Sequence, residues 1–421
     1  MSIGRSLQGG IYRAGLFGAK PVVPTSYDAL EAAAEQAMSA QAWSYVHGGA
    51  GNQATVRANR DALDRVRLVP RHLVDVDERD LSVELLGRTL PAPLLLAPIG
   101  VLEMAHPLAE HAVARAAAAV GVPMVISTQG SVPMEETVAS LGDTPRLYQL
   151  YWSREDALAR SFVERAEAIG ADAIVVTLDT HVLGWRTHDL DLGYLPFARG
   201  EGIAQYTSDP VFRALVEARV GGATGTATPR PTLAQIPAAL KALRSIHRHW
   251  PDRAGRGDPR PRLAVETFLD VFSRSDLTWP DLARLRAMTD LPILVKGVQH
   301  RDDARLAIEH GVDGIVVSNH GGRQVDGAIG SLEALPGVVE EVAGRVPVLF
   351  DSGVRSGADV VKALALGARA VLLGRPWVYG LALAGEDGVR AVLEHVIAEI
   401  DLTLGLIGAR SIADLGPEVL A

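Results

Sequence analysis

A histidine and an arginine lie three residues apart in the stretch SNHGGRQ, at His320 and Arg323. The stretch follows the apolar run GIVV, which has the composition of a buried strand. Imidazole can act as a general base near neutral pH, whereas guanidinium is a permanent cation that grips a carboxylate through two hydrogen bonds. One turn could therefore bind an organic acid and remove a proton from it.

Tyrosine, aspartate and a second arginine follow two other apolar runs. RLYQLYW carries Tyr151, and AIVVTLDT carries Asp179 and is followed by Arg186. Arg186 and Arg323 together suit a carboxylate, and an aspartate beside His320 would fix the tautomer of the imidazole. The alternative is a structural ion pair between Asp179 and an arginine, with His320 only packing. The arginine next to the histidine favours catalysis.

The last two apolar runs end in glycine and arginine. The sequence DSGVR contains Gly353 and Arg355, and LGRP contains Gly374 and Arg375. Glycine lets backbone N–H groups approach an anion closely, and the N-terminus of a following helix adds positive potential. Two such turns predict a phosphate site. Glycines that only make tight turns are the alternative.

Lys296 ends the run PILVKG and could form a Schiff base or place a fixed charge beside an electron-rich cofactor. Polar residues at other run ends could hydrogen-bond a heteroaromatic ring, and they are Ser127, Gln149, Thr177 and Ser318. Ordinary capping of strand ends is the alternative for each. One such residue alone is weak evidence for a site.

Eight short apolar runs, most of them separated by helix-like segments, indicate the fold. Their continuous hydrophobicity is typical of parallel strands that are buried on both faces, and they begin at residues 94, 124, 146, 173, 292, 314, 346 and 370. Eight strand–helix units predict an α/β fold with a closed (β/α)8 TIM barrel, and an open doubly wound sheet is the alternative. The strand ends listed above would then meet at one mouth, where sites are built in this fold.

Two segments lie outside this alternation of strands and helices. Residues 1–90 precede the barrel and include the helix-like segment DALEAAAEQAMSAQAWSYV, so we expect an N-terminal helical extension. Residues 187–265 form a long insertion after the fourth strand, with the helix-like segment LAQIPAALKALRSIHRHW. We expect this insertion to be a lid over the mouth, and a solvated decoration is the alternative. Residues 1–421 are expected to form a single domain.

The composition excludes several classes of site. The chain has no cysteine, which rules out disulfides, thiolate nucleophiles and cysteine-ligated metals, and no other motif predicts a metal. A net charge of −9 argues against nucleic acid or an anionic membrane as partner. No run approaches the roughly 18 apolar residues of a membrane span, and we find no signal-peptide core, so a cytoplasmic protein is expected.

The stretch SNHGGRQ closely resembles the active-site signature of the FMN-dependent α-hydroxy acid oxidases and dehydrogenases. The resemblance covers almost the whole chain, through SYVHGGAGNQATVRAN, LAPIG, QLYW, VTLDT, GWR, ILVKG, FDSGVRSGADV and LGRP in order. It implies a barrel that binds FMN and oxidises a small L-2-hydroxy acid to the 2-keto acid. Because related enzymes form tetramers or octamers, it also implies a homo-oligomer.

The resemblance implies a role for each matching residue. His320 would be the catalytic base, with Asp179 behind it. The substrate would be bound by Tyr45, Tyr151, Arg186, His320 and Arg323, and Tyr151 would also contribute to catalysis. The flavin ring would be held by Pro98, Ile99, Gly100, Ser127, Gln149, Thr177 and Ser318, with Lys296 beside flavin N1–C2. The ribityl phosphate would be held by Asp351, Gly353, Arg355, Gly374 and Arg375.

Within the family, the chain most resembles the lactate 2-monooxygenase branch, through IYRAGLFGAKPVVPTSY, DERDLSVELLG, SDPVFRA, Gly100 and the long insertion. That branch converts lactate and O2 into acetate, CO2 and water, because the keto acid stays bound while oxygen reacts. Gln129 departs from related enzymes and could hydrogen-bond a larger or more polar side chain than the methyl group of lactate. An oxidase or dehydrogenase on such a substrate is the alternative. A Schiff-base lyase using Lys296 and a flavin-binding barrel without turnover are the rivals from other classes.

Overall fold

The computed structural model describes residues 2–220, 232–252, 254–255 and 257–421. At its centre, eight parallel strands close into a barrel in the order β10-β3-β4-β5-β6-β7-β8-β9. The strands are β3 (Leu94–Leu96), β4 (Met124–Ser127), β5 (Arg146–Leu150), β6 (Ile174–Thr177), β7 (Ile293–Val298), β8 (Gly314–Val317), β9 (Val348–Phe350) and β10 (Ala370–Leu373). Pairing of β10 with β3 closes the ring, so the predicted (β/α)8 barrel is confirmed and the open sheet is excluded.

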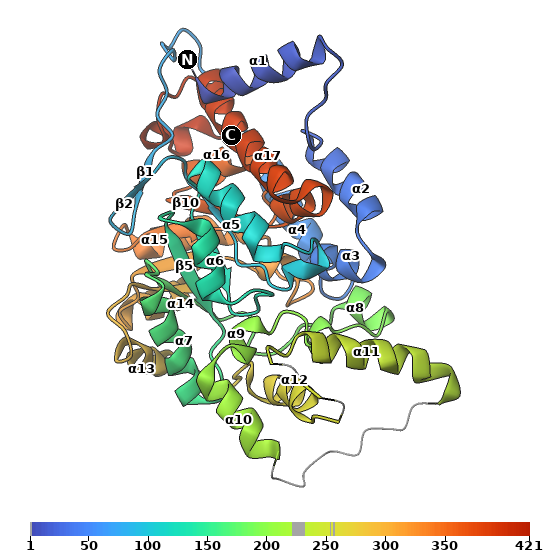
Figure 1. The fold of residues 1–421 in the computed structure, drawn as a ribbon. Coiled ribbons are helices and arrows are strands. Elements are labelled where there is room, and N and C mark those ends of the chain that lie inside the picture. The colour runs from blue at the N-terminus through green and yellow to red at the C-terminus, as the bar shows by residue number, and fades with distance from the viewer. Residues whose placement is uncertain (1, 221–231, 253, 256) are drawn as a thin grey trace.

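Amphipathic helices cover the outside of the barrel (Figure 1). They are α5 (Ala109–Val120), α6 (Met134–Leu141), α7 (Asp156–Ala168), α14 (Arg301–Glu309), α15 (Ser331–Val342), α16 (Gly357–Ala365) and α17 (Arg375–Ile407). Local signals set their ends: Ser356 accepts a hydrogen bond from the N–H of Asp359 at the start of α16, and Gly121 ends α5 in the left-handed conformation. Within the described ranges, none of the helices combines the length and apolar character that crossing a membrane requires.

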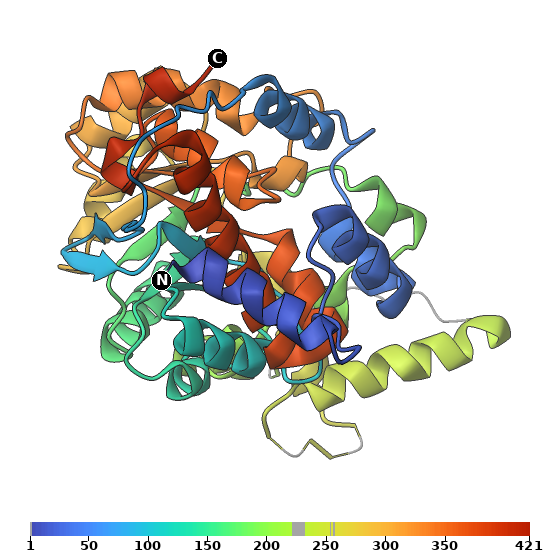
Figure 2. The same cartoon turned by 90° about the horizontal axis from the view of Figure 1, so that it is seen from above.

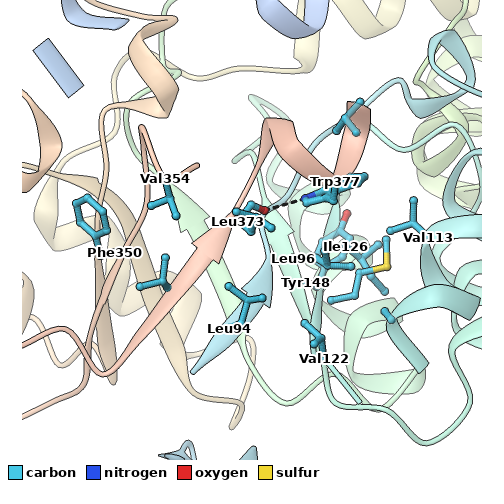
Figure 3. Packing of buried hydrophobic residues seen from close by; sticks show 14 of the residues in the cluster. Leu94, Leu96, Val113, Val122, Ile126, Tyr148, Phe350, Val354, Leu373 and Trp377 are labelled. Atoms are coloured by element: carbon cyan, nitrogen blue, oxygen red, sulfur yellow. Dashed lines mark hydrogen bonds between the residues drawn. The ribbon is translucent and has the colours of Figure 1, made fainter. Parts of the chain in front are cut away.

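Strand side chains alternate between two cores. Leu95 belongs to the cluster inside the barrel, whereas Leu94 and Leu96 belong to the larger cluster between the barrel and its helices. Figure 3 shows part of this outer core, where the indole N–H of Trp377 donates to the carbonyl of Leu373 at 2.7 Å. Burial on both faces explains why each strand is a continuous apolar run.

A hairpin closes the end of the barrel where the strands begin. It consists of β1 (Val83–Leu85) and β2 (Arg88–Leu90), paired antiparallel. Val83, Leu85 and Leu90 join the cluster inside the barrel. β1 lies in DERDLSVELLG and β2 follows it directly, in a region for which the sequence predicted no strands. Because it covers this end, the opposite mouth is the open one.

The N-terminal extension contains four helices, α1 (Ile3–Gly15), α2 (Tyr27–Ala37), α3 (Ala40–His47) and α4 (Ala54–Arg65). Figure 2 shows α1 lying across α17. The helix-like segment at 28–46 is not continuous, because Met38 is extended and Ser39 caps α3 by accepting a hydrogen bond from the N–H of Ala42. The break turns α3 toward the barrel mouth.

The predicted insertion lies between β6 and β7, and its residues 221–231, 253 and 256 fall outside the described part of the chain. The helices here are α8 (Thr187–Asp191), α9 (Ala204–Thr207), α10 (Pro210–Val220), α11 (Ile236–Arg248), α12 (Arg260–Val271) and α13 (Leu282–Arg286). Tyr206 of the insertion and Phe268 of α12 are fully buried, with their ring centroids 4.8 Å apart, so part of the insertion belongs to the core. In contrast, α11 buries no residue and extends from the body in Figure 2.

Candidate active site

His320 begins a short turn, η5 (His320–Gly322), directly after β8. Its φ of 58° is a left-handed conformation that is costly for a residue with a Cβ, and hydrogen bonds hold it. The N–H of His320 donates to Ser318 Oγ at 3.0 Å, and the N–H of Gly321 donates to Ser352 Oγ at 3.0 Å. His320 Nδ1 lies 2.8 Å from Asp179 Oδ1, which directs Nε2 toward any substrate.

Asp179 can approach His320 because a glycine lies beside it. Gly297 has φ 109° where the β7–β8 register shifts, and a Cβ there would lie 2.9 Å from Asp179. Burial acts to raise the pKa of Asp179, but the hydrogen bond from His320 and the charge of Lys296 lower it to about 2, so the carboxylate is ionised. Burial lowers the pKa of His320, which keeps the imidazole neutral and able to accept a proton.

Two arginines, buried Arg186 and half-buried Arg323, meet at the same mouth. Arg323 Nη1 donates to the carbonyl of Gly48 at 2.7 Å and its Cζ lies 5.1 Å from the ring centroid of Tyr45, while Arg186 Nη2 donates to Gln324 Oε1 at 3.0 Å. No carboxylate pairs with either arginine in the part of the chain that the structure describes. Burial and the neighbouring Arg186 both lower the pKa of Arg323. An anionic ligand would relieve this unfavourable pairing of cations.

Gln324 holds the loops of the site together, although sequence reasoning quoted it without giving it a role. Its Nε2 donates to the carbonyls of Asp179 at 2.7 Å and Val182 at 2.9 Å. The loop after β6 also packs closely on η5, since a Cβ on Gly184 would lie 2.6 Å from the carbonyl oxygen of Arg323. The side chains on these two loops are thereby brought together.

Lys296 is buried and fully paired. Its Nζ donates to Ser318 Oγ at 2.8 Å and lies 2.9 Å from Asp351 Oδ2. Burial acts to lower the pKa of this lysine, but the charges of Asp351 and Asp179 raise it above the ordinary value. A permanently charged amine is a poor nucleophile, so this geometry argues against a Schiff-base lyase.

Polar groups on neighbouring strands are left without partners. Gln149 Oε1 accepts from Ser127 Oγ at 3.3 Å and from the N–H of Thr128 at 3.2 Å, which leaves its amide nitrogen free. Gln149 Nε2 and Thr177 Oγ1 are both buried and unpartnered among the described residues. Buried polar groups are rarely left unsatisfied, so they fit a flat ligand with polar edges such as an isoalloxazine ring.

The turns after β9 and β10 present two arginines without acidic partners. Arg375 donates to the carbonyls of Val46 at 2.9 Å and Gly321 at 3.1 Å. Arg355 lies over the ring of Tyr27, with its Cζ 4.3 Å from the centroid. Neither forms an ion pair with a described carboxylate. Arginines in this state, next to glycine turns, fit a phosphate group.

One cavity of about 390 Å³ joins these sub-sites. Most of the residues predicted from the sequence line it, namely Tyr45, Pro98, Ile99, Gly100, Ser127, Tyr151, Arg186, Lys296, His320, Arg323, Asp351, Gly353, Arg355, Gly374 and Arg375. Gln149, Thr177, Asp179 and Ser318 do not line it, but each contacts or pairs with a residue that does.

Several other lining residues were not predicted, and six of them come from outside the strand ends and their turns. Tyr27 and Glu31 come from α2, and an apolar group comes from the segment between β6 and β7, consisting of Leu195, Phe197, Leu269 and Phe272. None of them stands at a strand end, and although Tyr27 ends the stretch IYRAGLFGAKPVVPTSY, no pattern in the sequence gave any of them a role at the site. Their role follows only from how the extension and the insertion fold onto the barrel.

Comparison with known proteins connects this cavity to a cofactor. The family model described as FMN-dependent dehydrogenase matches residues 34–421. The chain belongs to the FMN-dependent dehydrogenase family. It is 42% identical over 394 residues, covering 94% of this chain and 90% of the relative, to the FMN-dependent alpha-hydroxy acid dehydrogenase qulF of Penicillium citrinum.

Other members of the FMN-dependent dehydrogenase family are similar over comparable lengths. The L-lactate oxidase of Lysinibacillus sphaericus (strain C3-41) is 38% identical, covering 93% of this chain and 91% of the relative. A crystal structure of mandelate oxidase with (S)-4-hydroxymandelic acid aligns with TM-score 0.77 and 36% identity, over 94% of this chain and 98% of the other. The protein is therefore an FMN-dependent 2-hydroxy acid oxidoreductase, with FMN as its cofactor.

Proposed function

We propose that the protein oxidises an L-2-hydroxy acid with O2 as acceptor in a reaction of the lactate 2-monooxygenase type. The observation that carries the proposal is the meeting of Arg186 and Arg323, without a described acidic partner, beside a neutral histidine that Asp179 holds. A small acid supplies the missing negative charge, and its hydroxyl-bearing carbon then lies next to the base.

The residues divide the work between binding and proton transfer. The two arginines bind the substrate carboxylate, while Tyr45 and Tyr151, both lining the cavity, orient the carboxylate and hydroxyl groups. His320 accepts a substrate proton at Nε2, and ionised Asp179 stabilises the imidazolium that results. FMN, when bound, supplies the two-electron redox chemistry, including the reaction with O2.

The monooxygenase outcome requires the keto acid to stay in the site while oxygen reacts. With lactate, the balanced reaction is lactate plus O2 to acetate, CO2 and water. Leu195 and Phe197 of the insertion line the same cavity as His320, which supports a role in holding the product. Removal of 187–265 is unsuitable as a test, because the segment contains fully buried Tyr206 and Phe212.

Product analysis in air decides the proposal. The purified protein is incubated with lactate, and acetate, CO2, pyruvate and H2O2 are quantified. We expect acetate and CO2 in equal amounts with little H2O2. Equal amounts of pyruvate and H2O2 would instead identify a simple oxidase.

A second candidate function is oxidation of a larger 2-hydroxy acid by a simple oxidase or a dehydrogenase. The four apolar residues of the segment between β6 and β7 favour it, because together with Gln129 they line the cavity that receives the substrate. The proposal predicts a higher kcat/KM for a hydroxy acid with an aromatic or branched side chain than for lactate. Phe197→Ala should lower kcat/KM for the larger acid and leave that for lactate nearly unchanged. A preference for lactate would reject this candidate.

The remaining expectations stay predictions. Borohydride in the presence of a keto acid should leave the protein unlabelled, whereas trapping at Lys296 would revive the Schiff-base lyase. Bleaching of the bound flavin by a hydroxy acid without oxygen would exclude a barrel that only binds flavin. A cytoplasmic location and a homo-oligomer of four or eight chains are also proposed. The molar mass of the purified protein, measured by light scattering after size-exclusion chromatography, tests the number of chains.

A further inference from the structure

The phosphate end of the cavity is closed by a helix of the N-terminal extension. Tyr27 and Glu31 of α2 line the cavity together with Gly353, Arg355 and Arg375. The family model begins at residue 34, so both α2 residues precede it. Both residues therefore belong to the N-terminal extension and not to the barrel itself.

Arg355 is held by Tyr27. The Cζ of Arg355 lies 4.3 Å from the ring centroid of Tyr27, a close cation–π contact. Within the described ranges the guanidinium has no hydrogen bond or ion pair, although the backbone N–H of Arg355 donates to Asp359 at 2.9 Å. The ring of Tyr27 is thus the contact that fixes where this cation points.

Tyr27 is itself held by a hydrogen-bonded cluster that consists of Glu31, Tyr379 and His47. Its hydroxyl donates to Glu31 Oε1 at 2.7 Å, and the hydroxyl of Tyr379 in α17 donates to the same oxygen at 3.3 Å. His47 Nδ1 lies 3.4 Å from this oxygen, and the indole of Trp43 stacks on the His47 ring at 4.3 Å. The ring of Tyr27 therefore has little freedom to leave Arg355.

Burial and hydrogen bonds also determine the protonation states of Tyr27 and Glu31. Burial raises the pKa of Tyr27 to about 12, so its hydroxyl remains neutral and donates a hydrogen bond to Glu31. Burial acts to raise the pKa of Glu31, but hydrogen bonds from His47 and Tyr27 lower it to about 2. Glu31 is thus an ionised acceptor that anchors Tyr27 without neutralising Arg355 through a direct contact.

We propose that Tyr27 is a positioning residue for the cofactor phosphate, and that α2 caps this end of the cavity. The ring of Tyr27 holds Arg355 in place before FMN arrives, so less side-chain freedom is lost on binding. The inference depends on FMN as cofactor and on Arg355 as a phosphate ligand. It does not depend on which hydroxy acid is oxidised.

Binding of two flavins to the apoprotein tests this role. FMN and riboflavin share the ring and the ribityl chain but differ in the phosphate, and Kd is measured for each from flavin fluorescence. Tyr27→Ala should raise the Kd of FMN about two- to thirtyfold, the range expected for a cation–π contact, and leave the Kd of riboflavin unchanged. Tyr27→Phe, which keeps the ring but loses the hydrogen bond to Glu31, should raise the Kd of FMN less than Tyr27→Ala does.

Matched variants separate positioning from general damage to the fold. Tyr12→Ala, at an exposed tyrosine of α1, should change neither constant. In the Arg355→Ala background, Tyr27→Ala should have no further effect on FMN, because the guanidinium that the ring holds is gone. An equal loss of affinity for both flavins, or no loss for FMN, would overturn the proposal. At saturating FMN, hydroxy acid oxidation should persist in Tyr27→Ala, so failure here would be distinct from failure of the proposed function.

Discussion

The reactivity of His320 is set by its neighbours rather than by the imidazole alone. Asp179 orients one ring nitrogen and remains ionised because His320 and Lys296 offset the effect of its burial. Burial in turn keeps His320 neutral, which is the state a base needs. The two arginines complete a site whose charge is balanced only when an acid is bound.

Replacing the base tests its role directly. His320→Ala should keep bound FMN but slow flavin reduction by a 2-hydroxy acid at least about a hundredfold, the usual scale for a general base. Stopped-flow absorbance without oxygen measures the rate, and the flavin spectrum of the variant is the control for cofactor content. Reduction at the parent rate would remove His320 from catalysis.

The pH profile of kcat/KM follows from the direction of the pKa shifts. Because the pKa of His320 is lowered from 6.5, the neutral base persists at pH 6.5 and activity should fall only below that value. The charge of Asp179 raises the pKa of His320, so Asp179→Asn should move this acid limb to still lower pH and reduce the plateau. An acid limb that moves upward in the variant would contradict this assignment.

At the scale of elements, the insertion is fastened to the loop that follows β3. Glu103 of η1 (Leu102–Met104) lies 2.7 Å from His249 Nε2 at the end of α11. Its Oε1 also accepts from the N–H of Gly202 at 3.2 Å. Burial acts to lower the pKa of His249, but Glu103 raises it above 6.5, while nearby Arg248 opposes this.

This contact should make the docking of α11 depend on pH. Since the pKa of His249 is raised on folding, the stabilisation is complete below pH 6.5 and is lost as pH rises through the raised value. Limited proteolysis should cut His249→Gln about fivefold faster than the parent at pH 6, a factor equivalent to roughly 1 kcal/mol. The ratio of the two rates should approach one at pH 9. A ratio that is the same at both values would show that the pair does not hold α11.

For the whole molecule, the cofactor site is assembled from segments distant in the chain. The cavity is lined by residues from α2 at one extreme and from the start of α17 at the other, with the barrel strands between them. Figure 1 shows the N-terminal and C-terminal helices lying side by side, and α1 and α2 both contact α17. Binding at such a site should stabilise the fold globally.

Thermal unfolding measures this coupling. FMN at 100 times its Kd should stabilise the apoprotein by about 2.7 kcal/mol if it binds only the folded state. The unfolding temperature should rise with FMN concentration, and riboflavin at the same multiple of its own Kd should produce an equal shift. A transition temperature independent of FMN would show that the site is not coupled to global folding.

The order of strands and the catalytic turn were predictable because both depend on local sequence. Continuous apolar runs marked all eight strands, and most of the residues predicted at their ends line one cavity because parallel strands in a barrel all end at the same mouth. The break between α2 and α3 was missed because the apolar pattern continues across Met38 and Ser39, and only the Ser39 cap reveals it. The β1–β2 hairpin was missed because its strands are too short for a periodic signal.

The sequence alone predicted the barrel from eight continuous apolar runs, and it predicted a base next to a carboxylate-binding arginine from the spacing of His320 and Arg323 in one turn. The flavin was predicted from the resemblance of these motifs to a known family. Only the tertiary structure decided which charges are left without partners, and that Tyr27, Phe197 and Gln324 act at the site. Those properties depend on contacts between segments far apart in the chain, and burial changes both pKa values and the availability of hydrogen-bond partners in ways that no local pattern records.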